Sequence, residues 1–118
     1  MRYLIAICAL VLGIASADAH ARLDHASPAV GSTVERAPAS LSLFFTEPVE
    51  AAFSGATVHN AAGQRVDAGR AQIARDNKMQ LQVPLKQLPP GTYKVDWHVL
   101  STDTHKSKGS FSFTVGAH

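Results

Sequence analysis

Residues 91–100 read GTYKVDWHVL, a stretch in which large apolar side chains alternate with polar ones. Because successive side chains of a β-strand point to opposite faces, this alternation predicts a strand with one buried face. The turn-forming residues Pro89 and Pro90 come directly before it and mark where the strand begins. Its apolar positions, which we expect inside the protein, are Tyr93, Val95, Trp97 and Val99.

The same period of two recurs in three other stretches. Their apolar members complete the predicted core: Leu41, Leu43, Phe45, Met79, Leu81, Val83, Phe111, Phe113 and Val115. Weaker candidate strands are residues 22–25, 56–60 and 64–66. About seven short strands separated by Gly, Pro and Asn turns predict an all-β fold, an immunoglobulin-like Greek-key β-sandwich of antiparallel strands. Tyr93 resembles the tyrosine corner of such folds, in which the hydroxyl bonds to the backbone; an ordinary core position is the alternative.

The first 19 residues have the pattern of a secretory signal peptide. Arg2 is followed by an apolar run over residues 3–15 and by the small-x-small sequence at 17–19. Cleavage after residue 19 would leave residues 20–118, which have the length of one domain with one core. Cys8 is the only cysteine and would leave with the signal, so we expect neither a disulfide nor a thiolate ligand.

Charge and hydropathy exclude two classes of partner. The chain has 11 Lys and Arg against 9 Asp and Glu, a net charge of +2 with neutral His, and this balance gives no case for a nucleic-acid partner. No apolar segment beyond the signal approaches the roughly 20 residues that span a bilayer. A Sec-type signal with no lipidation cysteine after it favours the bacterial periplasm, with secretion as the alternative, and we expect a monomer that does not span the membrane.

His20 would become the first residue of the processed chain, and this makes it a candidate chelator. Its α-amine and imidazole Nδ1 together can bind one metal ion, and a two-nitrogen chelate suits tetragonal Cu(II). Asp103 and His105 are two positions apart, so in an extended chain a carboxylate and an imidazole would point to the same side. Two imidazoles, one amine and one carboxylate would form a four-ligand set.

The sequence from residue 20 onward resembles the CopC family of periplasmic copper-binding proteins. The resemblance rests on an ordered series of short motifs that runs nearly from end to end. These are His20-Ala21, Ser27-Pro28-Ala29 with Gly31, residues 41–45 leading into Thr46-Glu47-Pro48-Val49, residues 88–97, residues 101–105 and residues 109–115.

The resemblance implies both a site and a function. The family's Cu(II) ligands fall on His20, through amine and imidazole, and on Asp103 and His105, with one ion per chain. Glu47 matches an acidic residue near the metal and would bond to the His20 amine; the alternative is a solvated carboxylate. The implied role is copper homeostasis or resistance, with a CopD-type inner-membrane copper transporter as partner.

The sequence departs from the family pattern at two positions and in its methionine content. Thr104 stands where the family usually has Gly between the two ligands, and Arg22 stands where many members have a His. Members with a second, Cu(I) site carry a methionine cluster, whereas Met79 is the only methionine after the signal. We therefore expect a site for Cu(II) alone, with Met79 in the core.

The remaining histidines are weaker candidates. His25 is two positions after Leu23, so in a strand both would point to the same face, and His25 could approach the metal. Packing or solvation is the more common role for such a residue. His59 and His98 fall on polar strand faces, and His118 is at the terminus.

Two other functions compete with copper carriage. A terminal His and a second His also form the copper brace of oxidative enzymes such as polysaccharide monooxygenases. These enzymes leave the fourth equatorial position open, whereas Asp103 would fill it, so we expect no enzymatic activity. The third hypothesis is a structural sandwich module without metal.

Overall fold

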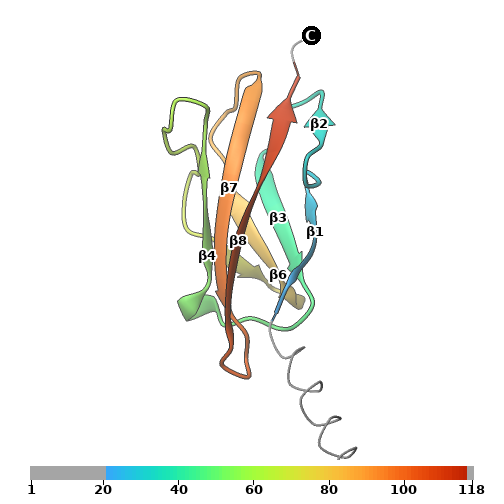
Figure 1. Ribbon diagram of the computed structural model, residues 1–118, viewed down its shortest axis with the longest axis vertical. Helices are drawn as coiled ribbons and strands as arrows, with labels where there is room; N and C mark the ends of the chain where they lie inside the picture. Colours follow the sequence, from blue (N-terminus) through green and yellow to red (C-terminus); the bar gives the residue numbers. More distant parts are fainter. Residues whose placement is uncertain (1–20, 117–118) are drawn as a thin grey trace, which may run out of the picture.

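The computed structural model describes residues 21–116, which fold into a sandwich of two four-stranded sheets (Figure 1). The first sheet has the order β1 (Leu23–Ser27), β3 (Ser40–Phe45), β6 (Asn77–Pro84), β5 (Gln72–Ala74). The second has the order β2 (Thr33–Val34), β8 (Lys106–Val115), β7 (Gly91–Leu100), β4 (Gly55–His59). A short 3-10 helix, η2 (Ala51–Phe53), precedes β4. The described residues contain no helix long and apolar enough to cross a membrane.

The predicted sandwich is confirmed, and its centre is the long β7–β8 hairpin. These strands pair antiparallel from Gly91 opposite Val115 to Leu100 opposite Lys106. Twelve of the thirteen predicted core residues are buried; they are Leu41, Leu43, Phe45, Leu81, Val83, Tyr93, Val95, Trp97, Val99, Phe111, Phe113 and Val115. Alternation along the strands therefore identified which face packs against the opposite sheet.

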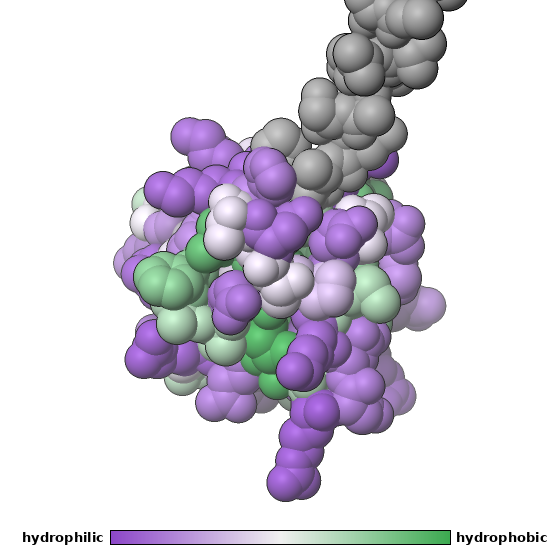
Figure 2. Space-filling view, turned by 90° about the horizontal axis from the view of Figure 1, so that it is seen from below, coloured by the Kyte–Doolittle hydropathy of each residue, from purple (hydrophilic) through white to green (hydrophobic). Residues whose placement is uncertain are grey.

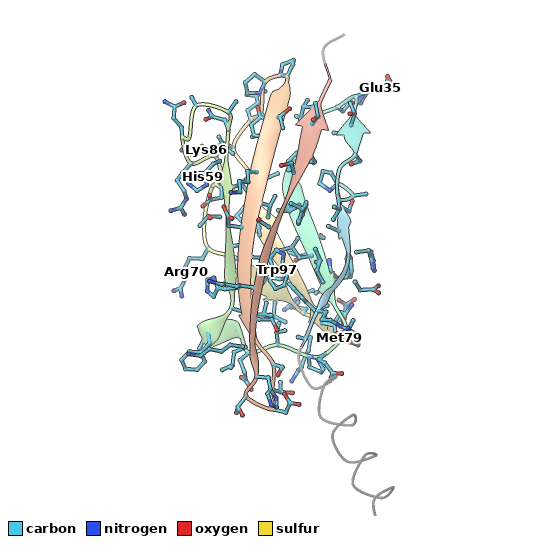
Figure 3. All side chains as sticks on the ribbon, viewed as in Figure 1. Glu35, His59, Arg70, Met79, Lys86 and Trp97 are labelled. Carbon is cyan, nitrogen blue, oxygen red and sulfur yellow. The ribbon has the colours of Figure 1, made fainter. Side chains whose placement is uncertain are left out.

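Met79 is the exception, because its side chain is 40% exposed rather than in the core. It has the inward parity of Leu81, but the pairing of β3 with β6 ends at Phe44 opposite Gln80. Met79 thus lies beyond the last position of β6 that pairs with β3, near the lower end of the sandwich in Figure 3. Parity places a side chain on a face, but burial also requires an opposite layer at that height.

The strands also differ from expectation at the sheet edges. Residues 64–66 form only an isolated bridge, His59 to Arg65, because Asn60 Oδ1 accepts hydrogen bonds from the backbone of residues 62 and 64 and shapes a turn there. The short strands β2 and β5 were not predicted. β2 pairs parallel with β8, so the prediction of antiparallel strands throughout was wrong at this edge.

Tyr93 forms the predicted tyrosine corner. Its hydroxyl donates a hydrogen bond to the carbonyl oxygen of Pro89 at 2.5 Å, and its ring stacks against Phe113 with centroids 5.6 Å apart. Burial raises the pKa of the Tyr93 hydroxyl, so the group stays protonated to a higher pH than an exposed tyrosine would. This bond fixes the entry of the chain into β7.

Trp97 lies midway along the sandwich (Figure 3) and packs edge-to-face on Phe45, with ring centroids 5.2 Å apart. Its partner across the hairpin is Gly109. A Cβ atom at Gly109 would lie 2.6 Å from Cζ2 of the indole, which is closer than atoms can pack. Gly109 is therefore the residue that makes room for Trp97 in the core.

The buried carboxylate of Asp67 joins the loop after β4 to that strand and forms an ion pair with the more exposed Arg65. The Asp67 carboxylate accepts hydrogen bonds from Arg65 Nε at 2.9 Å, from an Arg65 terminal nitrogen at 2.7 Å and from the Val58 backbone at 3.0 Å. The hydrogen bond from Arg65 is the main cause that lowers the pKa of Asp67 to about 2. The carboxylate is therefore charged throughout the neutral range.

Replacing Asp67 with Asn should lower the free energy of unfolding at pH 7 by about 2 kcal/mol, the free energy that corresponds to its pKa shift. Because the pKa is depressed in the folded state, this stabilisation is present above the unfolded pKa and is lost as pH falls from about 4 to about 2. Urea unfolding of both proteins at pH 7 and pH 3 measures it. Asp96→Asn is the control, since its exposed carboxylate lies 3.9 Å from Lys94. An equal loss at both pH values would contradict the assignment.

Candidate metal centre

The predicted ligands Asp103 and His105 lie in the tight connection between β7 and β8. Ser101 donates its backbone N–H to the carbonyl of His105 at 2.9 Å, and Thr104 donates to the carbonyl of Ser101 at 2.8 Å. Thr104 has a φ of 72°, in the left-handed region. A turn followed by a left-handed residue is a common three-residue hairpin loop, in which glycine usually takes the last place.

Thr104 therefore occupies a backbone conformation that favours glycine. A β-branched residue in this region costs on the order of 1–3 kcal/mol, and surrounding bonds must hold it there. The two backbone bonds of the loop do so. The loop thus adopts the glycine-type conformation although this chain carries threonine between the two predicted ligands.

The structure brings Asp103 and His105 together. Asp103 Oδ1 lies 3.2 Å from His105 Nδ1 and also accepts a short hydrogen bond from the Ser101 hydroxyl. The bond from Ser101, and then the bond with His105, lower the pKa of Asp103. An ionised carboxylate beside an imidazole is an oxygen and nitrogen donor pair that suits Cu(II). We predicted this proximity from an extended chain, but the turn produces it.

Ser101 is the residue that sequence reasoning missed. It is buried, and its hydroxyl contacts Asp103 Oδ1 and both the backbone N–H and the carbonyl of His105. Its hydroxyl thereby holds both candidate ligands in position. A serine at the first position of a turn is a recognised signal for side-chain bonding to the loop, and this signal could have identified it.

The chain immediately after residue 20 is anchored at the same end of the sandwich. Ala21 is fully buried. Two hydrogen bonds of 2.9 Å join Arg22 to Thr46. The Thr46 backbone N–H donates to the Arg22 carbonyl, and the Arg22 backbone N–H donates to the Thr46 hydroxyl. The start of β1 and the β7–β8 loop both lie at the lower end in Figure 1. His20 and His118 lie outside the described residues.

Residues 46–49 connect this anchor to the loop. Thr46 bonds to Arg22, while Pro48 accepts a hydrogen bond from the backbone of Thr102 at 3.1 Å. Val49 forms a bridge with Ser101. Glu47 is half-buried within this connecting segment, between the chain that follows His20 and the loop that carries Asp103 and His105. Its bond to the His20 amine stays a prediction.

The other described histidines, His25, His59 and His98, form no metal-binding group with Asp103 and His105. His25 stacks on Phe44, with centroids 4.3 Å apart, and bonds to Asp24 at 2.7 Å. His59 is in β4 and His98 is in β7. Within residues 21–116 no group of three or more His, Cys, Asp or Glu side chains could hold a metal ion. The described residues thus supply two candidate ligands, Asp103 and His105. The predicted amine and imidazole of His20 would have to supply the other two.

Comparison with known proteins identifies the family. A CopC domain model matches residues 23–116. Protein YobA of Escherichia coli strain K12 is 42% identical over 116 residues, which cover 98% of this chain and 94% of YobA. Copper resistance protein C of Xanthomonas campestris pv. juglandis is 39% identical over 117 residues, which cover 94% of this chain and 91% of that protein.

A solved structure extends the agreement to three dimensions. The crystal structure of CopC from Methylosinus trichosporium OB3b superposes with a TM-score of 0.78 and 32% identity, over 84% of this chain and 96% of that one. The Xanthomonas relative is named as a copper resistance protein rather than as an enzyme, which agrees with the expectation that this chain is not an enzyme. The chain, matched over nearly all its described residues, belongs to the CopC domain family.

Proposed function

We propose that the chain is exported to the periplasm, is cleaved after Ala19, and binds one Cu(II) ion. The ligands are the amine and imidazole of His20, the carboxylate of Asp103 and the imidazole of His105. The bound copper is buffered or carried for homeostasis and resistance, with delivery to a CopD-type inner-membrane transporter. The relatives named as copper resistance proteins, at 38–39% identity, support this proposal.

One observation carries the proposal: the Asp103–His105 pair and the chain that follows His20 are tied to one segment, residues 46–49. The donor set contains nitrogen and carboxylate oxygen and no thiolate, which suits Cu(II) better than Cu(I). With all four equatorial positions filled by protein atoms, the ion has no open equatorial place for oxygen chemistry, as carriage requires. Glu47 would accept a hydrogen bond from the His20 amine and orient it.

Removing His105 should weaken Cu(II) binding more than removing Asp103. An imidazole is the better donor for Cu(II), so His105→Ala should cost on the order of 100-fold in affinity and Asp103→Ala about 10-fold. Asp103→Ala should keep copper but admit water to the site, which would shift the visible and electron paramagnetic resonance spectra. Titration of processed protein against a competing chelator measures both affinities.

The same titrations test the pH dependence of the site and the competing hypothesis of a metal-free module. Copper must displace protons from imidazole and amine, whose reference pKa values are about 6.5 and about 7.7–8.0, so affinity should fall steeply below roughly pH 6. His59→Ala, in β4, is the matched control and should leave affinity unchanged. Full affinity in His105→Ala would remove that residue from the site, and absence of binding in the unmodified protein would overturn the proposed function.

A further inference from the structure

A hollow of about 600 Å³ opens on the outer face of the second sheet, next to the candidate metal centre. It is lined by Phe53, by residues 98–100 of β7 and by residues 106–108 of β8. Figure 2, which views this end of the molecule from below, shows green apolar surface exposed among purple polar side chains. A hollow of this size accommodates one or two side chains of a partner.

The apolar part of the hollow breaks the pattern of the sheet. Leu100 has the outward parity of Asp96 and His98, where the rest of β7 carries polar side chains, and yet it is only partly exposed. Phe53 is 64% exposed, the largest exposure among the large apolar side chains of the described residues. Two apolar side chains on a face that is otherwise polar indicate a surface used for contact.

Hydrogen bonds hold this apolar surface in place. The backbone N–H of Glu50, just before η2, donates to the carbonyl of Leu100 at 2.8 Å. The backbone N–H of Leu100 donates to the Ser54 hydroxyl, just after η2, at 3.2 Å. Both ends of the turn that carries Phe53 are thus fixed to Leu100. A surface arranged before binding loses little conformational entropy on contact.

The polar part of the hollow is basic. Lys106 and Lys108 line it on β8, His98 lines it on β7, and no lining residue is acidic. Two lysines beside exposed apolar side chains complement a carboxylate-bearing segment. A second copy of this chain would bring the same lysines against each other, which like-charge repulsion disfavours.

We propose that this hollow, formed by Phe53, Leu100, Lys106 and Lys108, docks an acidic segment with an aromatic or aliphatic side chain on the protein that exchanges copper with this chain. The inference rests on the proposed function. Leu100 directly precedes Ser101, and Lys106 directly follows His105. A segment seated in the hollow therefore holds its protein beside the loop of the candidate ligands, so that copper can pass over a short distance.

The test uses the processed, copper-free protein labelled with ¹⁵N and a synthetic nine-residue probe of Asp and Glu around one Phe. Two further probes replace Phe with Ala, or the acidic residues with Lys. We expect amide shifts at residues 53, 98–100 and 106–108 with the first probe only, and loss of these shifts in about 0.5 M salt, where surface charges are screened. Shifts elsewhere, or equal shifts with all three probes, would overturn the proposal.

Variants make the test specific. Phe53→Ser, and Lys106→Glu with Lys108→Glu, should each weaken probe binding about tenfold, whereas Lys86→Glu, at the far end of the sandwich in Figure 3, should change it less than about twofold. Dimerisation that depends on Phe53, or stronger binding to phosphatidylglycerol vesicles than to the acidic probe, would assign the hollow to another occupant and overturn the proposal.

Copper titration of the same variants separates the two proposals. We expect neither Phe53→Ser nor the double lysine variant to lower the copper affinity of the protein, because neither change removes a candidate ligand and the added carboxylates attract a cation. If the unmodified protein binds no copper, the proposed function fails while the probe experiment is unaffected. If copper binds and the acidic probe does not, only the docking surface is overturned.

Discussion

A methionine added ahead of His20 should weaken Cu(II) binding by two or more orders of magnitude. The added residue converts the His20 amine into a peptide nitrogen and moves the free α-amine away from the imidazole. The chelate ring through amine and Nδ1 can then no longer form, and Asp103 and His105 supply only one oxygen and one nitrogen donor. Competition with a chelator of known affinity, on extended and processed proteins at pH 7.5, measures the difference.

The control for this prediction is to remove the added methionine and measure whether the Cu(II) affinity returns. An aminopeptidase that removes the added methionine should return the full affinity, because the rest of the chain is unchanged. Equal affinity of the extended and processed proteins would show that the α-amine is not a ligand. The site would then have to be built from side chains alone.

Gly109→Ala should lower the free energy of unfolding by about 2–3 kcal/mol and the melting temperature by about 10–20 °C. The added Cβ would lie 2.6 Å from Cζ2 of Trp97, in a core where the indole also packs on Phe45. The indole must move, and close-packed neighbours on both sides resist the shift. Thermal and urea unfolding measure the loss.

Two further variants make this test specific. Gly116→Ala should change stability by less than about 0.5 kcal/mol, since its Cβ would meet Thr33 at an ordinary 3.5 Å. Combining Gly109→Ala with Trp97→Phe should give a smaller loss than the sum of the two single changes, because a smaller ring relieves the clash. A strictly additive loss would show that Gly109 and Trp97 do not interact.

The core was predictable because alternation along a strand is a local property of the sequence. Leu81 and Val83 were placed correctly by parity alone. Met79 was not, because its burial depends on where the partner strand ends, which no local pattern records. The parallel pairing of β2 with β8 is also non-local. The two residues of β2 show no strand pattern of their own and become a strand only by pairing with β8, which is distant in sequence.

The candidate site was predictable in part for the same reason. Asp103 and His105 are close in sequence, so their contact needed only a local argument, although the turn at Thr104 rather than an extended strand brings them together. The connection through residues 46–49 joins three distant parts of the chain and could not be derived locally. The hollow was not predicted, although Leu100 is an apolar residue at a position of β7 that is otherwise polar and could have indicated it.

The anchoring of Ala21 and Arg22 has a consequence for the order of events in the proposed export. A protease that cuts between residues 19 and 20 must bind several residues on both sides of that bond in an open chain. In the folded protein Ala21 is fully buried and the Arg22 backbone is bonded to Thr46, so these residues cannot enter a protease cleft. The proposed cleavage after Ala19 would therefore have to come before these residues fold. On that proposal, a molecule that folds first would keep residues 1–19 and never acquire the terminal amine.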